Sequence, residues 1–418
     1  MGEIGVGRVF ARRLTTVVAC GAVLRIVRFV VSKWNDPLLL NDSLYYSAQA
    51  RQLANGVWFR EVFVDQPGAE HGPLTSTLMA FVSWGDDPFN RQRMVTIACG
   101  IATIAVIGMI ARKVAGDRVG LLAAGLAALY PNLWISDGLV MSESVSCLTI
   151  SLTVWALLTW TAHPTGRAAC CVGVAAGFGA LARSEVVLFV PAAALVMWLV
   201  GRRSGMRPLK DVIAATGVAI AVMLPWLIFN LVRFDEPVFL TTNEGPALLG
   251  ANCDDTFYGS AQGGWSLACL FDPVARPNED PSERSARQRH EALSYVRHHA
   301  RSVPGVVLKR VGRSFDLFAT GEMVRGDAGE ERERLASWAG IVSFWLLTPI
   351  AVFGATITRR RDRAVLLIPV VIALATTVVI YGGHRMRSSA EPTIVILAAI
   401  ALGHWTGRLR QGSASLLS

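Results

Sequence analysis

Long apolar runs, separated by polar stretches, recur along the chain, and each run approaches the length of a membrane helix. A helix needs about 20 mostly apolar residues to cross the hydrocarbon core of a bilayer. We therefore expect an all-α polytopic bundle of about ten transmembrane helices. The expected segments are residues 14–32, 92–111, 118–136, 143–161, 168–183, 186–201, 211–231, 338–357, 364–382 and 389–405.

The first apolar segment differs from a cleaved signal peptide. It contains Arg25 and Arg28, and no small-residue cleavage pattern follows it, so we expect a retained membrane helix. The segments 168–183 and 186–201 are short and are separated only by "RSE". These two segments form either a tight helical hairpin or a pair of helices with a break between them.

Arginine and lysine gather in alternate loops, as in the cytoplasmic loops of membrane proteins. This alternation predicts a plasma-membrane protein with both termini in the cytoplasm. The loops on the outer side are then 33–91, 137–142, 182–185, 232–337 and 381–392, and they hold nearly all the polar residues. The chain divides accordingly into an N-terminal transmembrane module (1–231), an extracytoplasmic lobe (232–337) and a C-terminal part with the last membrane helices and a cytoplasmic tail (338–418).

Within the lobe, we expect helices at 282–301 and 306–318, with a break at Pro304. The lobe also holds Cys253 and Cys269, whereas the other five cysteines lie in apolar segments. If the lobe faces the outside of the cell, the oxidising environment favours a disulfide between these two residues.

The composition supports a membrane protein and argues against one that binds nucleic acid. Of the 418 residues, 52% are hydrophobic and 17% charged, whereas soluble domains are about a quarter charged. The net charge of +9 comes from basic residues that flank apolar segments and do not form one face. We expect membrane lipids among the partners and no nucleic acid.

Three acidic residues lie where the expected helices reach the outer surface. Carboxylates near hydrocarbon are costly, so they are functional candidates. Asp42 precedes a helical pattern that ends at Gly56, and it is an N-cap, a functional acid or both. Asp137 and Glu143 lie between the third and fourth segments; either is a functional acid or part of a solvated turn, with Glu143 helping to cap the fourth helix.

Basic residues also occur in the outer loops, where membrane proteins usually have few of them. They contact lipid headgroups, pair with Glu391, or bind an anionic ligand, since guanidinium groups match phosphate oxygens. The residues concerned are Arg183, His384, Arg385 and Arg387.

The outer loop 33–91 adds three candidates for substrate contacts. Tyr45 and Tyr46 line a sugar pocket or simply pack beside the membrane, and His71, next to Glu70 in "EHGPL", joins the same surface or has no special role. The chain lacks the glycine-rich phosphate loop of nucleotide-binding proteins. Acids and arginines at one membrane face therefore favour a phosphate-containing donor that is embedded in the bilayer.

The order of these motifs resembles that of the GT-C glycosyltransferases, and in particular the branch of protein O-mannosyltransferases and lipid A aminoarabinose transferases. The resemblance covers about residues 14–405. It rests on the acid after the first membrane helix, on "HGPL", and on segments similar to those of uncharacterised actinobacterial members. These segments are "YPNLWISDGLVMSE", "ALARSE", "PWLIFNLVRFDEPVFLTTNEGPALLGANC" and "RMRSSAEP".

The resemblance implies a GT-C-type bundle with the active site on its outer loops, and it implies residue roles. Asp42 would be the base, and Glu143, or else Asp137, would be the second acid. Arg385 and Arg387, with Arg183 and His384, would bind the donor phosphate. Many members have two adjacent acids at the first position, but here Asn41 replaces one of them. This leaves the use of a divalent metal ion open, and no cofactor is certain.

The implied function is transfer of a sugar, with inversion, from a polyprenyl-phosphate donor to an envelope glycan, lipid or protein acceptor at the outer face of the plasma membrane. The alternative is a transporter or flippase of lipid-linked sugars. A transporter would place charges or broken helices near the middle of the membrane. Because the centres of the segments are mostly apolar, the sequence favours an enzyme.

Overall fold

The computed structural model describes residues 3–39, 42–205, 207–271, 276 and 278–415, so Asn41 lies outside the described residues. Helices are the regular elements of this part of the chain, apart from one isolated bridge between Arg60 and Pro67. Eight segments within it are long and apolar enough to cross a membrane. Five of these segments lie in single helices: α1 (Glu3–Ser32), α4 (Phe89–Ala115), α7 (Glu143–Ala162), α10 (Leu209–Arg233) and α16 (Arg334–Ile357). The other three each lie in two consecutive elements: η1 (Ser184–Leu188) with α9 (Phe189–Arg203), α17 (Arg360–Leu366) with α18 (Ile368–Val379), and η4 (His384–Ala390) with α19 (Glu391–Ser415).

The two remaining expected segments form shorter helices. Residues 118–136 form α5 (Asp117–Leu129) and the single turn α6 (Pro131–Trp134), and residues 168–183 form α8 (Gly166–Ala182). Pro131 ends α5 early because the residue before a proline is driven out of the helical region, and Tyr130 is extended. All ten expected segments therefore contain a helix, and the predicted all-α membrane bundle is confirmed.

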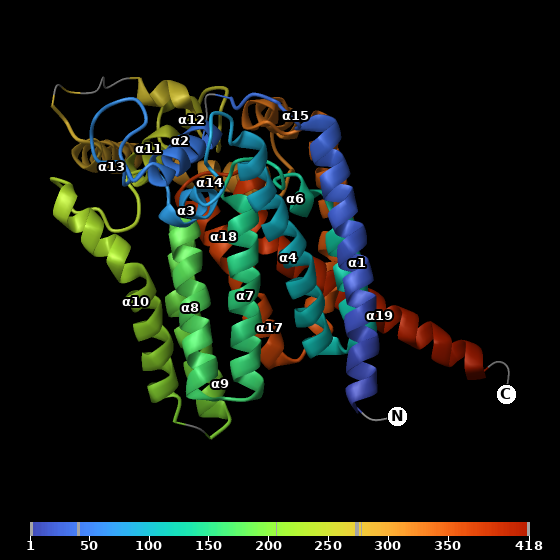
Figure 1. Ribbon diagram of the computed structural model, residues 1–418. Coiled ribbons are helices and arrows are strands. Elements are labelled where there is room, and N and C mark those ends of the chain that lie inside the picture. Colours follow the sequence, from blue (N-terminus) through green and yellow to red (C-terminus); the bar gives the residue numbers. More distant parts are fainter. Residues whose placement is uncertain (1–2, 40–41, 206, 272–275, 277, 416–418) are drawn as a thin grey trace.

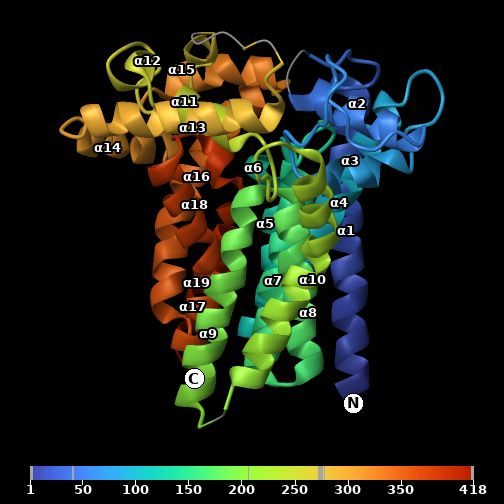
Figure 2. The ribbon, with the colours of Figure 1, turned by 90° about the vertical axis from the view of Figure 1, so that its left-hand side faces the viewer.

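The remaining helices gather at one end of the bundle, while both termini lie at the other end (Figures 1 and 2). We call the end with these helices the loop end. Its helices are α2 (Asp42–Ala54), α3 (Pro73–Ala80), α11 (Glu244–Ala251), α12 (Asp254–Phe257), η2 (Leu267–Leu270), α13 (Pro281–His298), α14 (Val303–Ser314), α15 (Thr320–Gly326) and η3 (Asp327–Glu330). Long loops thus fold into a layer of short helices at one end of the membrane helices.

Two features of the expected lobe are present in this layer. Cys253 and Cys269 form a disulfide, which ties α12 to η2. The expected helices at 282–301 and 306–318 correspond to α13 and α14, but Pro304 lies in the first turn of α14 and does not break a helix. A proline is tolerated there because the first turn has no internal partner for its N–H.

Small residues allow the membrane helices to approach closely. A methyl group added at Gly173 or Gly177 of α8 would lie 2.3 Å from the Ala215 carbonyl oxygen or 3.0 Å from that of Ala219, both on α10. Such small-residue contacts are a typical means of helix association in lipid, where the hydrophobic effect does not drive helices together. Close packing fixes the relative heights of the helix ends and hence of the polar residues that they carry.

Candidate active site

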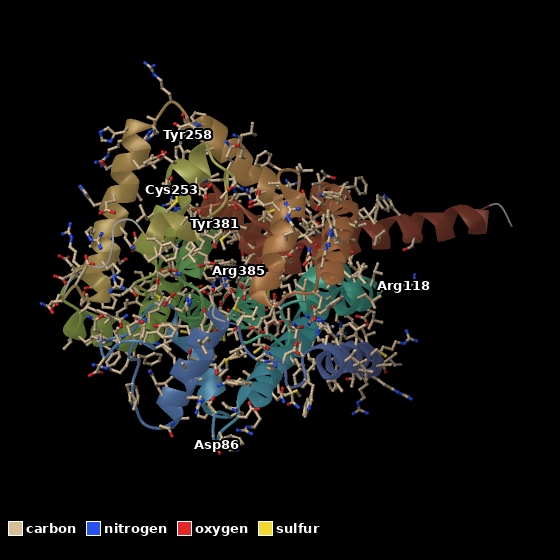
Figure 3. The ribbon with its side chains drawn as sticks, turned by 90° about the horizontal axis from the view of Figure 1, so that it is seen from above. Asp86, Arg118, Cys253, Tyr258, Tyr381 and Arg385 are labelled. Atoms are coloured by element: carbon tan, nitrogen blue, oxygen red, sulfur yellow. A yellow bond between two sulfur atoms is a disulfide. The ribbon has the colours of Figure 1, made fainter. Side chains whose placement is uncertain are left out.

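A cavity of about 300 Å³ opens at the loop end of the bundle. Its walls come from segments that are far apart in the chain: the start of α2, the turn before α3, the turn between α8 and η1, the region around α11, and the end of α18 with η4. Five of the predicted site residues line it, namely Asp42, Tyr46, His71, Arg183 and Arg385. In Figure 3, Arg385 and Tyr381 of this cavity lie near the middle of the view, whereas Tyr258 and Asp86 lie toward its edges.

The guanidinium group of Arg385 is the centre of the cavity's charged network. Its Nη2 donates to Asp42 Oδ2 at 2.6 Å, its Nε to Glu143 Oε1 at 2.5 Å, and its Nη1 to Glu330 Oε1 at 3.2 Å. Charges removed from water are stable only when paired in this way. Three carboxylates from α2, α7 and η3 therefore meet on one arginine.

Glu143 lies behind this arginine and does not line the cavity. Its side chain is 2% exposed, and its Oε1 also accepts a hydrogen bond of 3.1 Å from Arg183 Nη1. Arg183 in turn pairs with Glu185 at the start of η1. One carboxylate oxygen thus holds two guanidinium groups side by side at the cavity wall.

Asp42 is the first residue of α2, so its charge opposes the positive end of the helix dipole. Burial raises the pKa of Asp42, but the positive charges of Arg385 and His71 lower it more, so the pKa lies well below its usual value. His71 shows the reverse balance: burial lowers its pKa, and the charges of Asp42 and Glu70 raise it above the usual value. Asp42 is therefore ionised at neutral pH.

Asp42, Glu70 and His71 have their donor atoms within 4.8 Å of one another. His71 Nε2 is buried, has no hydrogen-bond partner among the described residues, and lies 3.6 Å from Asp42 Oδ1 and 3.8 Å from Glu70 Oε1. Two carboxylates and one imidazole suit a divalent cation such as Zn²⁺ or Mn²⁺. The residues therefore fit a metal ion, whereas the sequence motifs predicted only a base role for Asp42 and a substrate contact for His71.

The two predicted tyrosines have different positions. Tyr46 lines the cavity, and its ring stacks on His71 with 4.7 Å between ring centroids. Tyr45 lies beneath the cavity wall, where its hydroxyl accepts hydrogen bonds from Gln49 Nε2 at 2.9 Å and from the Glu70 backbone N–H at 3.0 Å. Tyr45 therefore fixes the backbone that carries Glu70 and does not face the cavity.

Asp137 lies apart from the cavity. It accepts hydrogen bonds of 2.6 Å from both Arg25 Nε on α1 and Ser144 Oγ on α7, and its side chain is buried. The structure therefore brings Glu143, and not Asp137, next to Asp42 and the arginines. Asp137 instead ties α1 to the turn that precedes α7.

Arg387 and His384 also lie outside the cavity lining, although they flank Arg385 in η4. Arg387 donates to Asp316 at 2.8 Å and to Glu391 at 2.6 Å, and it stacks over Phe344. His384 lies between Asp316 and Asp327, at 3.2 and 2.7 Å. These two residues anchor η4 to the segment around α15 and η3.

Several cavity residues were not predicted as site residues. Tyr381, Thr241, Asn243 and Glu244 line the cavity, and Glu330 contacts Arg385 from outside it. Proximity to Arg385 in "YGGHR" was a signal that could have identified Tyr381. Nothing in "GEERER" distinguishes Glu330 from its charged neighbours, because its role depends on a contact 55 positions away.

A second, larger hollow of about 880 Å³ adjoins the cavity and shares Glu185, Thr241 and Thr376 with it. One part of its wall is apolar and comes from η1, α18 and the loop after α10. The other part is polar and comes from α11 and α13, with Ser285 and Arg289. The apolar part includes residues of η1 and α18, which belong to segments apolar enough to cross a membrane, so the charged cavity continues into a groove with one apolar wall.

Comparison with known proteins gives one family match and several structural matches. Residues 70–229 match the family of dolichyl-phosphate-mannose-protein mannosyltransferases. No curated protein sequence matches the chain.

The archaeal oligosaccharyltransferase AglB from Archaeoglobus fulgidus, solved with an inhibitory peptide and a dolichol-phosphate, superposes with a TM-score of 0.60 at 16% identity. The match covers 96% of this chain and 51% of that one. The same oligosaccharyltransferase with Zn and sulfate has a TM-score of 0.58 at 14% identity, covering 96% and 50%. This chain thus spans about half the length of the archaeal enzyme.

ArnT from Cupriavidus metallidurans, solved with undecaprenyl phosphate, has a TM-score of 0.43 at 17% identity, covering 96% of this chain and 79% of that one. The archaeal structures, which have the higher TM-scores, share the arrangement of helices along 96% of this chain. The chain therefore has the GT-C-type fold that the resemblance of its sequence implied.

Proposed function

We propose that the chain is a membrane glycosyltransferase that transfers a sugar from a polyprenyl-phosphate donor to a hydroxyl acceptor, with inversion. One observation carries this proposal: a carboxylate, Asp42, and two arginines, Arg183 and Arg385, line a single cavity that continues into an apolar groove. A lipid-linked sugar phosphate requires these features together. The groove suits its hydrocarbon chain, the arginines suit its phosphate, and the carboxylate suits the acceptor proton.

The arginines would hold the donor phosphate. Guanidinium groups bind phosphate oxygens with paired hydrogen bonds, and the two groups already lie side by side on Glu143. The apolar part of the groove, between η1, α18 and the loop after α10, would receive the first isoprene units. Dolichol-phosphate and undecaprenyl phosphate in the solved relatives are ligands of this chemical class.

The chemistry requires one base and one stabilised leaving group. The acceptor oxygen attacks the anomeric carbon and forms the new glycosidic bond, while its proton passes to the Asp42 carboxylate. The bond between the anomeric carbon and the phosphate oxygen breaks, and its electron pair stays on the polyprenyl phosphate. Arg385 and Arg183 stabilise the charge that develops there. A single displacement of this kind inverts the anomeric centre.

Glu143 has a positioning role in this proposal. It is buried behind the arginines and does not line the cavity, so it holds the two guanidinium groups and does not contact the acceptor. This assigns the second acid of the site to Glu143 and leaves Asp137 as a structural partner of Arg25.

A divalent ion would bind at Asp42, Glu70 and His71. When bound, such an ion would supply positive charge next to the donor phosphate. Zinc titration of the purified protein, followed by calorimetry, tests the site independently of activity: His71→Ala should weaken binding at least tenfold. Equal zinc binding by the variant and the wild type would exclude this ligand set.

The orientation in the membrane is part of the proposal. The basic loops between membrane helices support a cytoplasmic position for both termini, and the loop end with the cavity would then face outside the cell. A disulfide in the layer at that end agrees with an oxidising compartment. The acceptor would be an envelope glycan, lipid or protein.

The test is transfer by the purified protein in proteoliposomes from a radiolabelled polyprenyl-phosphate sugar. Asp42→Asn should lower kcat by about 10²- to 10⁴-fold while donor binding persists, because a positioned base contributes about that much. Near-normal turnover by a folded Asp42→Asn protein would exclude Asp42 as the base. Movement of the intact donor across the bilayer without transfer would instead favour the flippase alternative.

A further inference from the structure

Each nitrogen of the Arg385 guanidinium group already contacts a carboxylate, and these contacts use three of its five N–H donors. Asp42, Glu143 and Glu330 occupy its Nη2, Nε and Nη1, respectively. A phosphate binds an arginine best through two parallel hydrogen bonds to adjacent nitrogens. If Arg385 binds the donor phosphate, as the proposed function requires, the phosphate approaches nitrogens that already carry carboxylates and is repelled by them, so displacement of one carboxylate favours its binding.

The three carboxylates differ in how firmly they are held. Glu143 is 2% exposed and also bonded to Arg183, and Asp42 Oδ2 lies 2.6 Å from Arg385 while its Oδ1 faces His71. The Asp42 and Glu330 side chains are about equally exposed, at 29% and 30%, but Glu330 has the longest contact with Arg385, 3.2 Å against 2.6 Å for Asp42. The other oxygen of Glu330 already lies 3.4 Å from Arg332 Nε. Glu330 is thus the weakest of the three partners, and it has a second cation within reach.

The segment that carries Glu330 is anchored on both sides. Asp327 accepts a hydrogen bond from His384, Glu331 pairs with Arg93 at 3.4 Å, and Glu333 pairs with Arg28 at 2.7 Å. These contacts join η3 and the residues after it to η4, α4 and α1. The backbone on either side of Glu330 is therefore fixed, and only its side chain is placed to change partner.

We propose that Glu330 is an exchangeable counter-ion of Arg385. The donor phosphate replaces Glu330 on Nη1, and the displaced carboxylate pairs with Arg332. When the sugar has been transferred, Glu330 returns to Arg385 and helps to expel the polyprenyl phosphate. Glu330 therefore lowers the affinity of the site for donor and product alike and accelerates product release.

The charges around Arg385 explain why Glu330 would lower the affinity for the donor phosphate. Without Glu330, Arg385 would keep two carboxylate partners and offer Nη1 to the phosphate without competition. Removal of an acidic group next to an anion-binding arginine also removes a repulsive charge. The loss of competition for Nη1 and the loss of the repulsive charge both favour phosphate binding, so removal of the Glu330 carboxylate should tighten it. Removal of a residue that merely supports the fold should instead weaken phosphate binding.

The first experiment measures binding of a polyprenyl phosphate to the full-length protein in nanodiscs. Glu330→Gln should bind it about five- to tenfold more tightly than the wild type, since a close charge contact is worth about this much. Glu330→Asp, which withdraws the carboxylate by one methylene group, should tighten binding by a smaller factor. Glu322→Gln is the matched control: it removes the same charge from α15, where Glu322 pairs with Arg313 at 3.0 Å, and it should change binding less than twofold.

The second experiment examines the alternative partner. Arg332→Gln should weaken binding of the polyprenyl phosphate about threefold, because displaced Glu330 then has no second cation. In the Glu330→Gln background, the same substitution should have little effect. Additive effects of the two changes would mean that Arg332 acts only through its general charge and would overturn the exchange.

The outcomes separate this inference from the proposed function. Unchanged or weaker binding by both Glu330 variants, when the wild type binds, would overturn the exchange and leave the donor class intact. If the wild type does not bind the polyprenyl phosphate at all, the proposed donor class fails. In turnover, Glu330→Gln should lower the donor KM and increase inhibition by added polyprenyl phosphate by the same five- to tenfold.

Discussion

Arg385 and Arg387 stand two positions apart in the same turn of η4, yet they belong to different regions of the molecule. Arg385 lines the cavity and shares its guanidinium group among three carboxylates, of which Glu330 has the longest contact, 3.2 Å. Arg387 is buried between Asp316 and Glu391 and stacks over Phe344. In the proposed mechanism, the first arrangement exchanges a protein carboxylate for the donor phosphate, whereas the second holds η4 to its neighbouring segments.

Of the two arginines, the one that lines the cavity, Arg385, should show the largest effect on activity when it is replaced. Arg385→Gln should lower kcat/KM for the donor by about 10²- to 10³-fold, because it removes positive charge from the leaving phosphate. The thermal unfolding temperature should change much less than activity, since Asp42 keeps His71 and Glu143 keeps Arg183 as partners. Transfer assays and melting curves on the same preparation check both statements. Activity within tenfold of the wild type would contradict the role of Arg385.

Arg387→Gln should have the opposite profile. It leaves the buried Asp316 and Glu391 without their cation, so the free energy of unfolding should fall by about 3–5 kcal/mol. The donor KM of the protein that remains folded should stay close to that of the wild type. Melting curves combined with kinetics per folded molecule would measure this. A large rise in donor KM without loss of stability would place Arg387 among the phosphate ligands.

The next effect tests the positioning role of Glu143 against the structural role of Asp137. Glu143→Gln should raise the donor KM about tenfold, because the two arginines lose the charge that holds them side by side. Asp137→Asn should leave the donor KM unchanged and lower the unfolding temperature, because its partner Arg25 is buried. If the two substitutions exchanged these effects, Asp137 would be the second acid of the site.

The smallest expected effect is the acid sensitivity of the buried cluster that Asp316, Asp327 and His384 form. Burial raises the pKa of Asp316 and Asp327, but hydrogen bonds from His384 outweigh it, so both pKa values lie below the usual value. A carboxylate with a lowered pKa in the folded state stabilises the protein above its unfolded pKa, about 4, and loses this contribution as the pH falls. The melting temperature should therefore drop by a few degrees as the pH falls from about 5 through the lowered pKa values of the folded state. Asp316→Asn should reduce the size of that drop, and an unchanged pH profile would count against the contribution of this cluster.

Much of the fold could be predicted from the sequence. Each apolar run predicted a helix because the transfer of side chains into lipid depends mainly on local composition. The positions of Asp42, Glu143, Arg183 and Arg385 at one end of the bundle also followed, since each adjoins the end of an expected helix. Helix ends were less predictable: a proline shortened α5, and another began α14 where a break was expected.

The partners of the site residues could not be predicted in the same way. Asp137 and Glu143 occur in one short motif with similar surroundings, but Arg25 from α1 pairs with the first, and Arg183 and Arg385 pair with the second. His384 and Arg387 also looked equivalent to Arg385, although their carboxylate partners lie in the segment around α15 and η3 and at the start of α19. Glu330 had no distinguishing signal at all.

The sequence by itself determined that this protein is a helical membrane bundle with these acids and arginines at one end of it, because hydropathy and charge act over short stretches of chain. Only the tertiary structure decided which of those charges meet in the cavity. Asp42 and Arg385 are 343 positions apart, and Arg385 and Glu143 are 242 apart. Contacts at such separations depend on the packing of whole helices, which fixes the height and direction of each side chain and so selects the few charges that face a ligand.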